Sequence, residues 1–371
     1  MGEWIECTLG DIVTFQRGHD LPKTKMTGEG YPVAGSNGVI GYHSEFTTKA
    51  PAITIGRSGN VGNPYIYYEN IWAHNTTLYI KEYKNVIPEF VYYFLKTLDL
   101  GSFAGGSAVP TLNRNHIHTL PIRIPKSKED QEAIADILRT LDKKIEANDK
   151  INRNLLEQAI AVFTEKIWSQ EKNGTIGDYC VMKSGFAFKS SWWTGEGVKV
   201  IKIGDINQDN LNLNTCSCVE EDKIEKAKEF KVRTGDLVLA MTGATIGKFA
   251  MIPERDETIL VNQRVGKFFL GDEPLKRIPF IYCTLKMDEV YSEVIGRGQG
   301  SAQPNISAND VMTIPCVIPS QKEIDDFNTF AEPIYTNIVK NQNENEKLAN
   351  LRDSLLPKLM SGELDVSDLE I

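Results

Sequence analysis

The fold of this chain is decided by residues 131–168, which read QEAIADILRTLDKKIEANDKINRNLLEQAIAVFTEKIW. Apolar and small side chains recur in this stretch at alternating steps of four and three residues, which is the heptad pattern of a helix with one buried seam. At 1.5 Å per residue such a helix would be about 57 Å long. The seam positions are Ile134, Leu138, Leu141, Ile145, Asn148, Asn152, Leu155, Ala159 and Val162.

A second helix of the same kind is predicted from about Gln321 to Met360, with its seam 193 residues after the first. Two similar heptad helices on one chain should pair with each other rather than leave both seams in water. The seam positions of this second helix are Ile334, Ile338, Asn341, Asn345, Leu348, Arg352 and Leu355.

Two asparagines fall at the same seam positions in both helices. In an antiparallel pair, Asn148 and Asn152 would face Asn345 and Asn341. A buried amide is satisfied only by a polar partner, so these four residues would fix the register of the pair. The alternative is a seam that opens to solvent in its middle.

The long helices end the two copies of an internal repeat. Residues 9–12, LGDI, recur as residues 176–179, IGDY, and a glycine follows the aspartate by seven residues in both copies. Residues 106–112, GSAVPTL, recur 194 residues later as GSAQPNI, and the agreement at this offset continues to residue 125. The middle of each copy matches poorly. One frame that carries two different middle regions suggests one scaffold with two different surfaces.

The globular part of each copy is predicted to be mixed α/β. Strands are expected at residues 52–55, 198–203 and 237–241, and a helix opened by proline at 88–95. The predicted organisation is a first domain at 1–125, a spacer helix at 126–172, a second domain at 173–319, and a final helix with a tail at 320–371. Antiparallel pairing of the helices would relate the two domains by a pseudo-twofold axis.

The net charge of −9 argues at first against a nucleic-acid partner. Its distribution weakens that objection, because residues 320–371 alone hold 5 Lys/Arg against 11 Asp/Glu, whereas residues 1–125 hold 10 of each. DNA binding follows the local potential of one face and not the total charge.

The N-terminus has neither the basic nor the apolar segment of a signal peptide, and no apolar stretch is long enough to span a membrane. The six cysteines include no CxxC pair, and we expect free thiols in a reducing cytoplasm.

The duplicated organisation and its motifs resemble the specificity (S) subunits of type I restriction-modification enzymes. The resemblance covers the whole length, and the order, duplication and spacing of the motifs carry it. The motifs are LGD at 9–11 with Gly18, GSNGVIGY at 35–42, IGRSG at 55–59, PIRIP at 121–125 before QEAI at 131–134, and LLPKLMSGEL at 355–364.

This resemblance implies two target-recognition domains, each of which reads one half of a two-part asymmetric DNA site. It also implies a host-defence role, with double-stranded DNA, two methyltransferase (M) subunits and restriction (R) subunits as partners. Adenine methylation with S-adenosylmethionine, and cleavage with ATP and Mg²⁺, would then belong to those partners. This chain would be a non-catalytic subunit that binds no metal or cofactor.

Two other functions compete with this one. A coiled-coil scaffold that binds only proteins would not need two different surfaces. A self-contained methyltransferase would need a cofactor loop and an intact NPPY motif, and residues 63–65, NPY, lack the second proline. His116 and His118 could ligate a metal, but no third ligand has matching spacing, so solvated or locally hydrogen-bonded histidines are expected.

Candidate DNA contacts must be donors on exposed loops, because base edges are read by Arg, Lys, Asn and Gln, and phosphates by basic and hydroxyl groups. In the first copy the candidates are Arg17, His19, Ser36, Asn37, Arg57, Ser58, Asn60 and Arg114. In the second copy they are Lys183, Lys189, Thr242, Thr245, Gln263, Arg264, Arg297, Gln299 and Ser301. The alternative for each is an ordinary solvated surface residue.

Apolar residues also flank the seam of the first helix, and an exposed apolar stripe is typical of a docking surface for partner subunits. The predicted docking residues are Ile137, Ile151, Leu156, Ile160 and Phe163.

Overall fold

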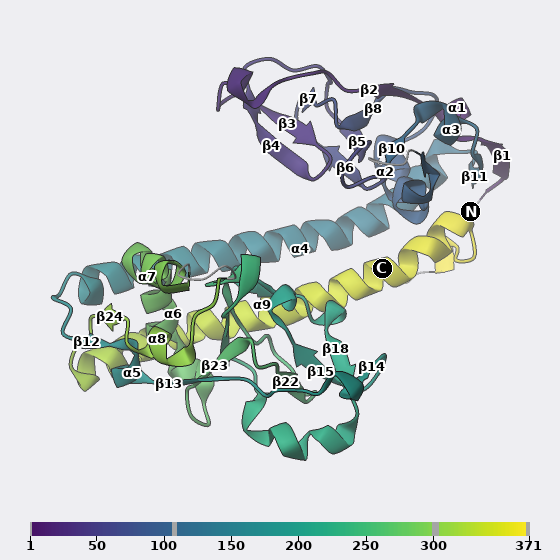
Figure 1. The fold of residues 1–371 in the computed structure, drawn as a ribbon. Coiled ribbons are helices and arrows are strands. Elements are labelled where there is room, and N and C mark those ends of the chain that lie inside the picture. Colours follow the sequence, from purple (N-terminus) through teal and green to yellow (C-terminus); the bar gives the residue numbers. More distant parts are fainter. Residues whose placement is uncertain (1, 106–109, 299–303, 369–371) are drawn as a thin grey trace. The chain divides into compact units, whose positions relative to one another are not determined.

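The computed structural model describes residues 2–105, 110–298 and 304–368. The chain divides into two compact units, one formed by Met1–Lys144 with Leu348–Ile371 and the other by Ile145–Lys347. Two long helices, α4 (Lys128–Phe163) and α9 (Gln321–Ser361), contribute to both units (Figure 1). The α4 helix continues into a π-helical turn at Thr164–Trp168.

The first unit contains a four-stranded antiparallel sheet in the order β2–β8–β5–β6 and a three-stranded sheet in the order β4–β3–β7. Their strands are β2 Val13–Arg17, β8 Thr77–Tyr83, β5 Ala52–Gly56, β6 Pro64–Tyr67, β4 Gly38–His43, β3 Tyr31–Gly35 and β7 Trp72–Ala73. Two further antiparallel pairs complete the unit, namely β1 Trp4–Thr8 with β11 Pro121–Pro125, and β9 Ala104–Gly105 with β10 Thr111–Leu112.

The second unit contains a four-stranded antiparallel sheet in the order β13–β23–β20–β21 and a five-stranded mixed sheet in the order β14–β18–β15–β22–β19. Their strands are β13 Val181–Ser184, β23 Val265–Phe269, β20 Leu237–Ala240, β21 Phe249–Met251, β14 Trp193–Thr194, β18 Ser217–Val219, β15 Val198–Ile201, β22 Ile259–Val261 and β19 Lys231–Val232. The remaining antiparallel pairs are β12 Gly174–Thr175 with β24 Pro315–Cys316, and β16 Ile206–Asn207 with β17 Asn210–Leu211.

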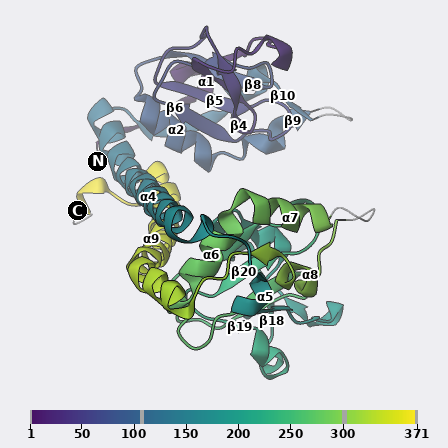
Figure 2. The same cartoon turned by 90° about the vertical axis from the view of Figure 1, so that its left-hand side faces the viewer.

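Short helices join these strands. The first unit has α1 Leu9–Ile12, α2 Pro88–Thr97 and α3 Arg114–His118. The second has α5 Ile176–Tyr179, α6 Ile278–Lys286, α7 Asp288–Gly298 and α8 Ala308–Met312 (Figure 2). Single 3-10 turns lie at Lys23–Lys25, Leu100–Phe103, Ser190–Trp192, Ile203–Asp205, Leu213–Thr215, Glu221–Lys223, Glu225–Phe230, Gly243–Thr245, Pro274–Lys276 and Val366–Asp368.

The repeat is visible in the frame of both units. In each unit the first helix is capped in the same way, since the amide of Thr8 donates to Asp11 (2.8 Å) and that of Thr175 to Asp178 (2.8 Å). Each unit also has the same outer strand pair and the same four-stranded antiparallel sheet. The middle sheets differ, with three strands in one unit and five in the other, and the short pairs β9–β10 and β16–β17 lie at different places in the two units. The prediction of a shared frame with different middle regions is therefore confirmed.

The glycine that both copies carry seven residues after the capping aspartate has a steric reason in each unit. A Cβ at Gly18 would lie 2.1 Å from the carbonyl oxygen of His74, and one at Gly185 would lie 2.4 Å from that of Val261. Real Cβ atoms do not approach this closely, so the backbone crossing at this point of the frame requires glycine.

Most of the predicted elements are confirmed with small changes in their ends. The helix predicted at 88–95 is α2, whose Pro88 occupies the first turn, where its missing amide costs no hydrogen bond. The predicted strands are β5, β15 and β20. The second long helix runs to Ser361 and continues through Pro333 and Pro357. All six cysteines are free thiols, as expected.

Candidate nucleic-acid interface

A polar cavity of about 990 Å³ opens on the first unit and collects four of the predicted DNA contacts, Arg17, His19, Arg57 and Arg114. These residues come from the end of β2, the loop after β5 and the start of α3. The sheet order brings them together, because β2 and β5 both pair with β8. Three arginines and one carboxylate, that of Asp20, are among the residues that line the cavity, and an excess of guanidinium groups suits an anionic or hydrogen-bond-accepting ligand.

Two of the three arginines of this cavity are free to bind a ligand. Arg17 forms an exposed ion pair with Asp20 (3.4 Å), and Asn75 also donates to this carboxylate. Within residues 2–105, 110–298 and 304–368, the guanidinium groups of Arg57 and Arg114 have neither an acidic partner nor a hydrogen bond. The guanidinium groups of Arg57 and Arg114 are therefore available to bind a ligand.

The other predicted contacts of the first unit lie close to this cavity. Ser58 forms an isolated β-bridge with Thr111, which lines the cavity. Ser36, in the turn between β3 and β4, lies against the same loop, since its Oγ is 3.2 Å from the Cβ position of Gly59. Asn37 is exposed in the same turn, and Asn60 accepts a hydrogen bond from Asn63. The structure thus brings the candidates of the first copy to one set of adjoining loops.

His118 accepts a long-range hydrogen bond, whereas the sequence predicted a solvated or locally hydrogen-bonded ring. The pairing of β2 with β8 shifts register between Thr14 and Phe15, and the amide of Phe15 instead donates to Nε2 of His118 (2.9 Å). In the second unit the amide of Met182 donates to the Sδ of Met312 (3.3 Å) at the matching place. A thioether therefore replaces the imidazole in the other copy.

This contact predicts a pH dependence of stability. Burial, and then the charges of Arg114 and Lys84, lower the pKa of His118 below its usual value of 6.5. The neutral ring is the bound form, so its contribution is complete above pH 6.5 and is lost as the pH falls from 6.5 through the lower folded pKa. We expect His118→Met to remove this part of the acid sensitivity, about 1 kcal/mol.

The measurement is the thermal unfolding midpoint of both proteins between pH 7.5 and 5. The wild-type midpoint should fall more steeply with acid than that of the variant, because methionine does not titrate. Equal slopes for the two proteins would show that His118 is not the group responsible.

The candidates of the second unit are more scattered. Gln263 and Arg264 are exposed in the loop between β22 and β23, and Lys189 is exposed before the turn at Ser190–Trp192. Lys183 is exposed on β13 but forms an ion pair with Glu229. Thr245 donates weakly to the carbonyl of Thr242 (3.5 Å). Gln299 and Ser301 lie outside the described residues.

Two candidates of the second unit do not have the exposed position that was predicted for them. Thr242 is only 8% exposed, because its segment forms a β-bridge with Asn305. Arg297 is occupied within the chain, since it donates to the carbonyl of Asp310 (2.8 Å) and to Thr313 (2.8 Å), and forms an ion pair with Glu293. The sequence could not show these long-range partners.

The same pattern of backbone hydrogen bonds identifies equivalent positions in the two units. In the first unit, the amide of Arg57 donates to the carbonyl of Thr76, and the carbonyl of Arg57 accepts from the amide of Leu112. In the second unit, the amide of Met241 donates to the carbonyl of Arg264, and the carbonyl of Met241 accepts from the amide of Ile306. Met241 therefore occupies in the second unit the place that Arg57 has in the first. By the two repeat offsets, Ser184 stands at the place of Arg17 and Ala308 at that of Arg114. The arginines of the cavity belong to one copy only.

Further cavity residues were missed by the sequence analysis. The lining also includes Gln16, Asn113 and His116. Asn113 caps α3 by accepting from the amide of Asn115 (3.0 Å), so its polar side chain also has a structural role. Gln16, Asn113 and His116 lie within two residues of Arg17 or Arg114 in the chain, and this proximity is the sequence feature that could have identified them.

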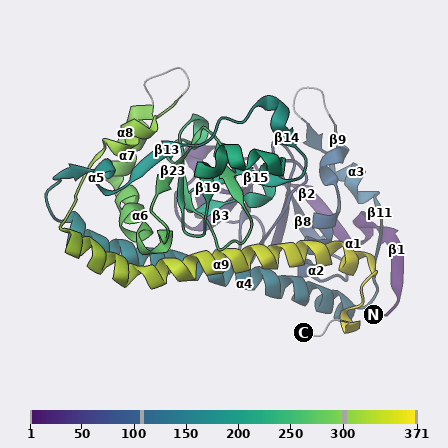
Figure 3. The ribbon, with the colours of Figure 1, turned by 90° about the horizontal axis from the view of Figure 1, so that it is seen from below.

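The two long helices lie side by side within each unit (Figure 3). In the second unit, Asn148 donates to Asn345 (2.9 Å) and Asn341 donates to Asn152 (2.8 Å), so the four seam asparagines lie opposite each other in antiparallel order. In the first unit, Arg352 of α9 donates to Asp142 of α4 (2.6 Å), and Tyr93 of α2 donates to the other oxygen of the same carboxylate (2.7 Å).

The predicted docking stripe is largely covered by the chain itself. Phe163 is completely buried in the core of the second unit, where its ring centre lies 5.7 Å from that of Phe280 and 5.3 Å from that of Phe327. This assignment was therefore wrong. Ile137, Leu156 and Ile160 are partly buried against the cores of their units. Among the five predicted docking residues, Ile151 alone is clearly exposed, at 48%.

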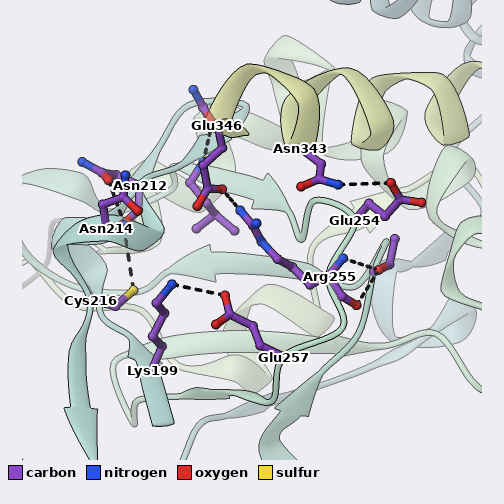
Figure 4. Close-up of polar contacts among 12 residues, drawn as sticks. Lys199, Asn212, Asn214, Cys216, Glu254, Arg255, Glu257, Asn343 and Glu346 are labelled. Carbon is purple, nitrogen blue, oxygen red and sulfur yellow. Dashed lines mark hydrogen bonds and ion pairs between the residues drawn. The ribbon is translucent and has the colours of Figure 1, made fainter. Parts of the chain in front are cut away.

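A partly buried ion pair joins a loop of the second unit to α9. Arg255, in the loop between β21 and β22, is paired with Glu346, and their side chains are 13% and 21% exposed (Figure 4). Next to it, Asn343 donates to Glu254 (3.2 Å). Burial lowers the pKa of Arg255; among the described residues neither its Nε nor its Nη2 has a hydrogen-bond partner, and the contact of Nη2 with Glu346 is an ion pair. The stability of this charge therefore depends on Glu346.

Other kinds of site are not found in the part of the chain that the structure describes. That part contains no group of three or more His, Cys, Asp or Glu side chains that could hold a metal ion. Nor does it contain a helix with the length and apolar character needed to cross a bilayer.

Comparison with known proteins gives a consistent result. The family model described as "Type I restriction modification DNA specificity domain" matches residues 1–157 and 169–351. A relative from Methanocaldococcus jannaschii, "Type I restriction enzyme MjaVIII specificity subunit", is 26% identical over 335 residues, which cover 84% of this chain and 78% of that protein. The MjaIX specificity subunit of the same organism is 26% identical over 329 residues, with 77% and 73% covered.

A solved structure is similar over nearly its whole length. The S subunit of a type I restriction-modification system from M. genitalium aligns over 96% of both chains with a TM-score of 0.61. Because the identity is 19%, this similarity shows the fold alone.

Proposed function

Because this chain belongs to the family of type I restriction-modification DNA specificity domains, we propose that it is the subunit that selects the DNA sequence in such a system. The observation that carries the proposal is the arginine-lined cavity, in which Arg57 and Arg114 have no acidic partner among the described residues. A cavity with free cationic forks suits the acceptor-rich edges and phosphates of DNA.

The proposed target is a two-part asymmetric site, with one half bound by each recognition domain. The shared frame supports two similar docking geometries, and the replacement of Arg57 by Met241 at the matching place supports different reading chemistry. The paired helices are proposed to act as an antiparallel coiled-coil spacer, whose length sets the distance between the two halves.

The chemistry is proposed to belong to the partners. Two methyltransferase subunits would dock on the helices, with Ile151 as an exposed contact, and restriction subunits would join them. S-adenosylmethionine, ATP and Mg²⁺ would then be bound by those subunits, in the cytoplasm.

A DNA footprint of the assembled complex tests the proposal against a protein-binding scaffold. The chain is purified with its methyltransferase partner and incubated with genomic fragments, and the protected segments are sequenced. A common two-part segment that is protected only when this chain is present supports the proposal. If the complete, active complex protects no specific segment, the scaffold function is favoured instead.

The four seam asparagines are proposed to fix the register of the helix pair. Asn341→Leu removes the donor to Asn152 and should lower the free energy of unfolding by about 1 kcal/mol, because the remaining amide loses its partner. The double variant Asn152→Leu/Asn341→Leu should recover that loss, since no polar group is left unpaired. Denaturant unfolding measures both values, and simple addition of two losses would contradict a direct pairing.

A further inference from the structure

We propose that Arg57 reads a guanine in the half-site bound by the first unit, an inference that rests on the proposed DNA-binding function. Three observations support this proposal. They are the fixed backbone of Arg57, its free guanidinium group, and the methionine that replaces it in the second copy.

The backbone of Arg57 is fixed on both sides. Its amide donates to the carbonyl of Thr76 (2.8 Å), and its own carbonyl accepts from the amide of Leu112 (2.9 Å). The loop behind it is closed onto Gly56, whose carbonyl accepts from Gly62 (2.9 Å). A Cβ at Gly56 would lie 1.7 Å from the carbonyl oxygen of Asn60, so this closure needs glycine. A backbone that is fixed in this way suits contact with a base edge, because base recognition demands a defined side-chain geometry. Contact with a phosphate places a weaker demand on geometry.

The guanidinium group of Arg57 is available to a ligand. It lines the open cavity and has no acidic partner or hydrogen bond within the described residues, whereas Arg17 is paired with Asp20. The planar fork of arginine matches O6 and N7 of guanine in the major groove, which no other base presents as two adjacent acceptors. Arg114, which also lines the cavity, supplies positive charge that attracts the adjacent phosphates.

The second copy shows that the frame does not need an arginine at this place. Met241 makes the same pair of backbone hydrogen bonds, with Arg264 (3.0 Å) and Ile306 (2.9 Å), yet its side chain is only 4% exposed. The charge of Arg57 therefore has no role in forming the shared backbone arrangement. It also follows that the second half-site is read without this contact.

The test is the methylation consensus of three proteins, each produced with its methyltransferase partner in cells that lack other adenine methylation. They are the wild type, Arg57→Ala and Arg57→Lys, with Arg123→Ala as a matched control, since Arg123 is exposed on β11 and does not line the cavity. Thermal unfolding shows that each variant is folded, and co-purification shows that each complex is assembled.

The wild-type consensus should contain a fixed G·C pair in one half. Arg57→Ala should lose the preference at that single position by about ten- to a hundredfold and leave the other half unchanged. Arg57→Lys should lose it too, because a point charge cannot form both bonds at once. Arg123→Ala should keep the wild-type consensus.

Several results would overturn the assignment. One is a consensus that stays unchanged in Arg57→Ala while methylation falls evenly at all sites, above all if Arg57→Lys restores it, because that is the behaviour of a phosphate contact. Another is a wild-type two-part consensus without a fixed G·C pair at a position that depends on Arg57. A wild type that directs no two-part consensus at all would instead contradict the proposed function itself.

Discussion

Replacing Phe163 by alanine is expected to lower the free energy of unfolding of the second unit by about 3–5 kcal/mol. The side chain is completely buried, and its ring packs against Phe280 and Phe327 between α4, α6 and α9. Truncation removes these contacts and leaves a cavity that the packed helices cannot close. Urea unfolding, followed by circular dichroism, measures the loss.

Ile151→Ala is the matched control for Phe163→Ala, because it truncates an apolar side chain on the same helix that is 48% exposed. Its effect on stability should stay within about 0.5 kcal/mol. If Ile151 contacts the methyltransferase, this variant should weaken that association while the isolated chain remains stable. Equal stability of the two variants would contradict the assignment of Phe163 to the core.

Glu346→Leu should destabilise the second unit by about 2–4 kcal/mol, because it leaves the largely desolvated charge of Arg255, whose side chain is 13% exposed, without its partner. Removing one member of a buried pair costs more than removing both, since an unpaired charge stays in a poorly solvated place. The double variant Arg255→Met/Glu346→Leu should therefore recover most of the loss.

The two single variants and the double variant form a cycle that is measured by denaturant unfolding. A positive recovery of at least about 1 kcal/mol in the double variant is expected for a direct pair. Independent, additive losses would show that Arg255 and Glu346 do not interact in solution.

The sequence predicted the elements whose signals are local or periodic. The heptad seam predicted two long helices and the positions of four asparagines, which lie opposite each other in the second unit. The repeated LGD and GSA motifs predicted two copies of one frame, because turns and caps such as Thr8 with Asp11 depend on neighbouring residues. For the middle regions, the sequence predicted only that the two copies differ. It did not predict the strand order of either middle sheet.

The sequence could not show which surfaces the chain covers itself. Phe163 continues an apolar stripe, and nothing in the stripe indicates that α6 packs over its end. In the same way, the burial of Thr242 and the engagement of Arg297 depend on segments far along the chain. Periodicity reports that a face is apolar or polar, but its partner is set by tertiary structure.

For the candidate site too, the sequence identified residues but not how the fold brings them together. The expectation of donors on exposed loops pointed to Arg17, Arg57 and Arg114, and the fold then places all three residues in the lining of one cavity. Neither of the two repeat offsets pairs Arg57 with Met241, because the middle regions differ in length, and residues 55–59 resemble residues 241–243 only loosely. The correspondence of Arg57 with Met241 required the matching backbone hydrogen bonds of the two units.

The most direct test of the central claim is the sequencing of methylated adenines in DNA from cells that express this chain with its methyltransferase partner, compared with cells that lack this chain. We predict a two-part consensus with a fixed unread gap that appears only when this chain is present. Exchange of residues 173–319 for those of a relative should then change one half of the consensus alone. The absence of any new consensus, with a partner that is active alongside another specificity subunit, would contradict the account.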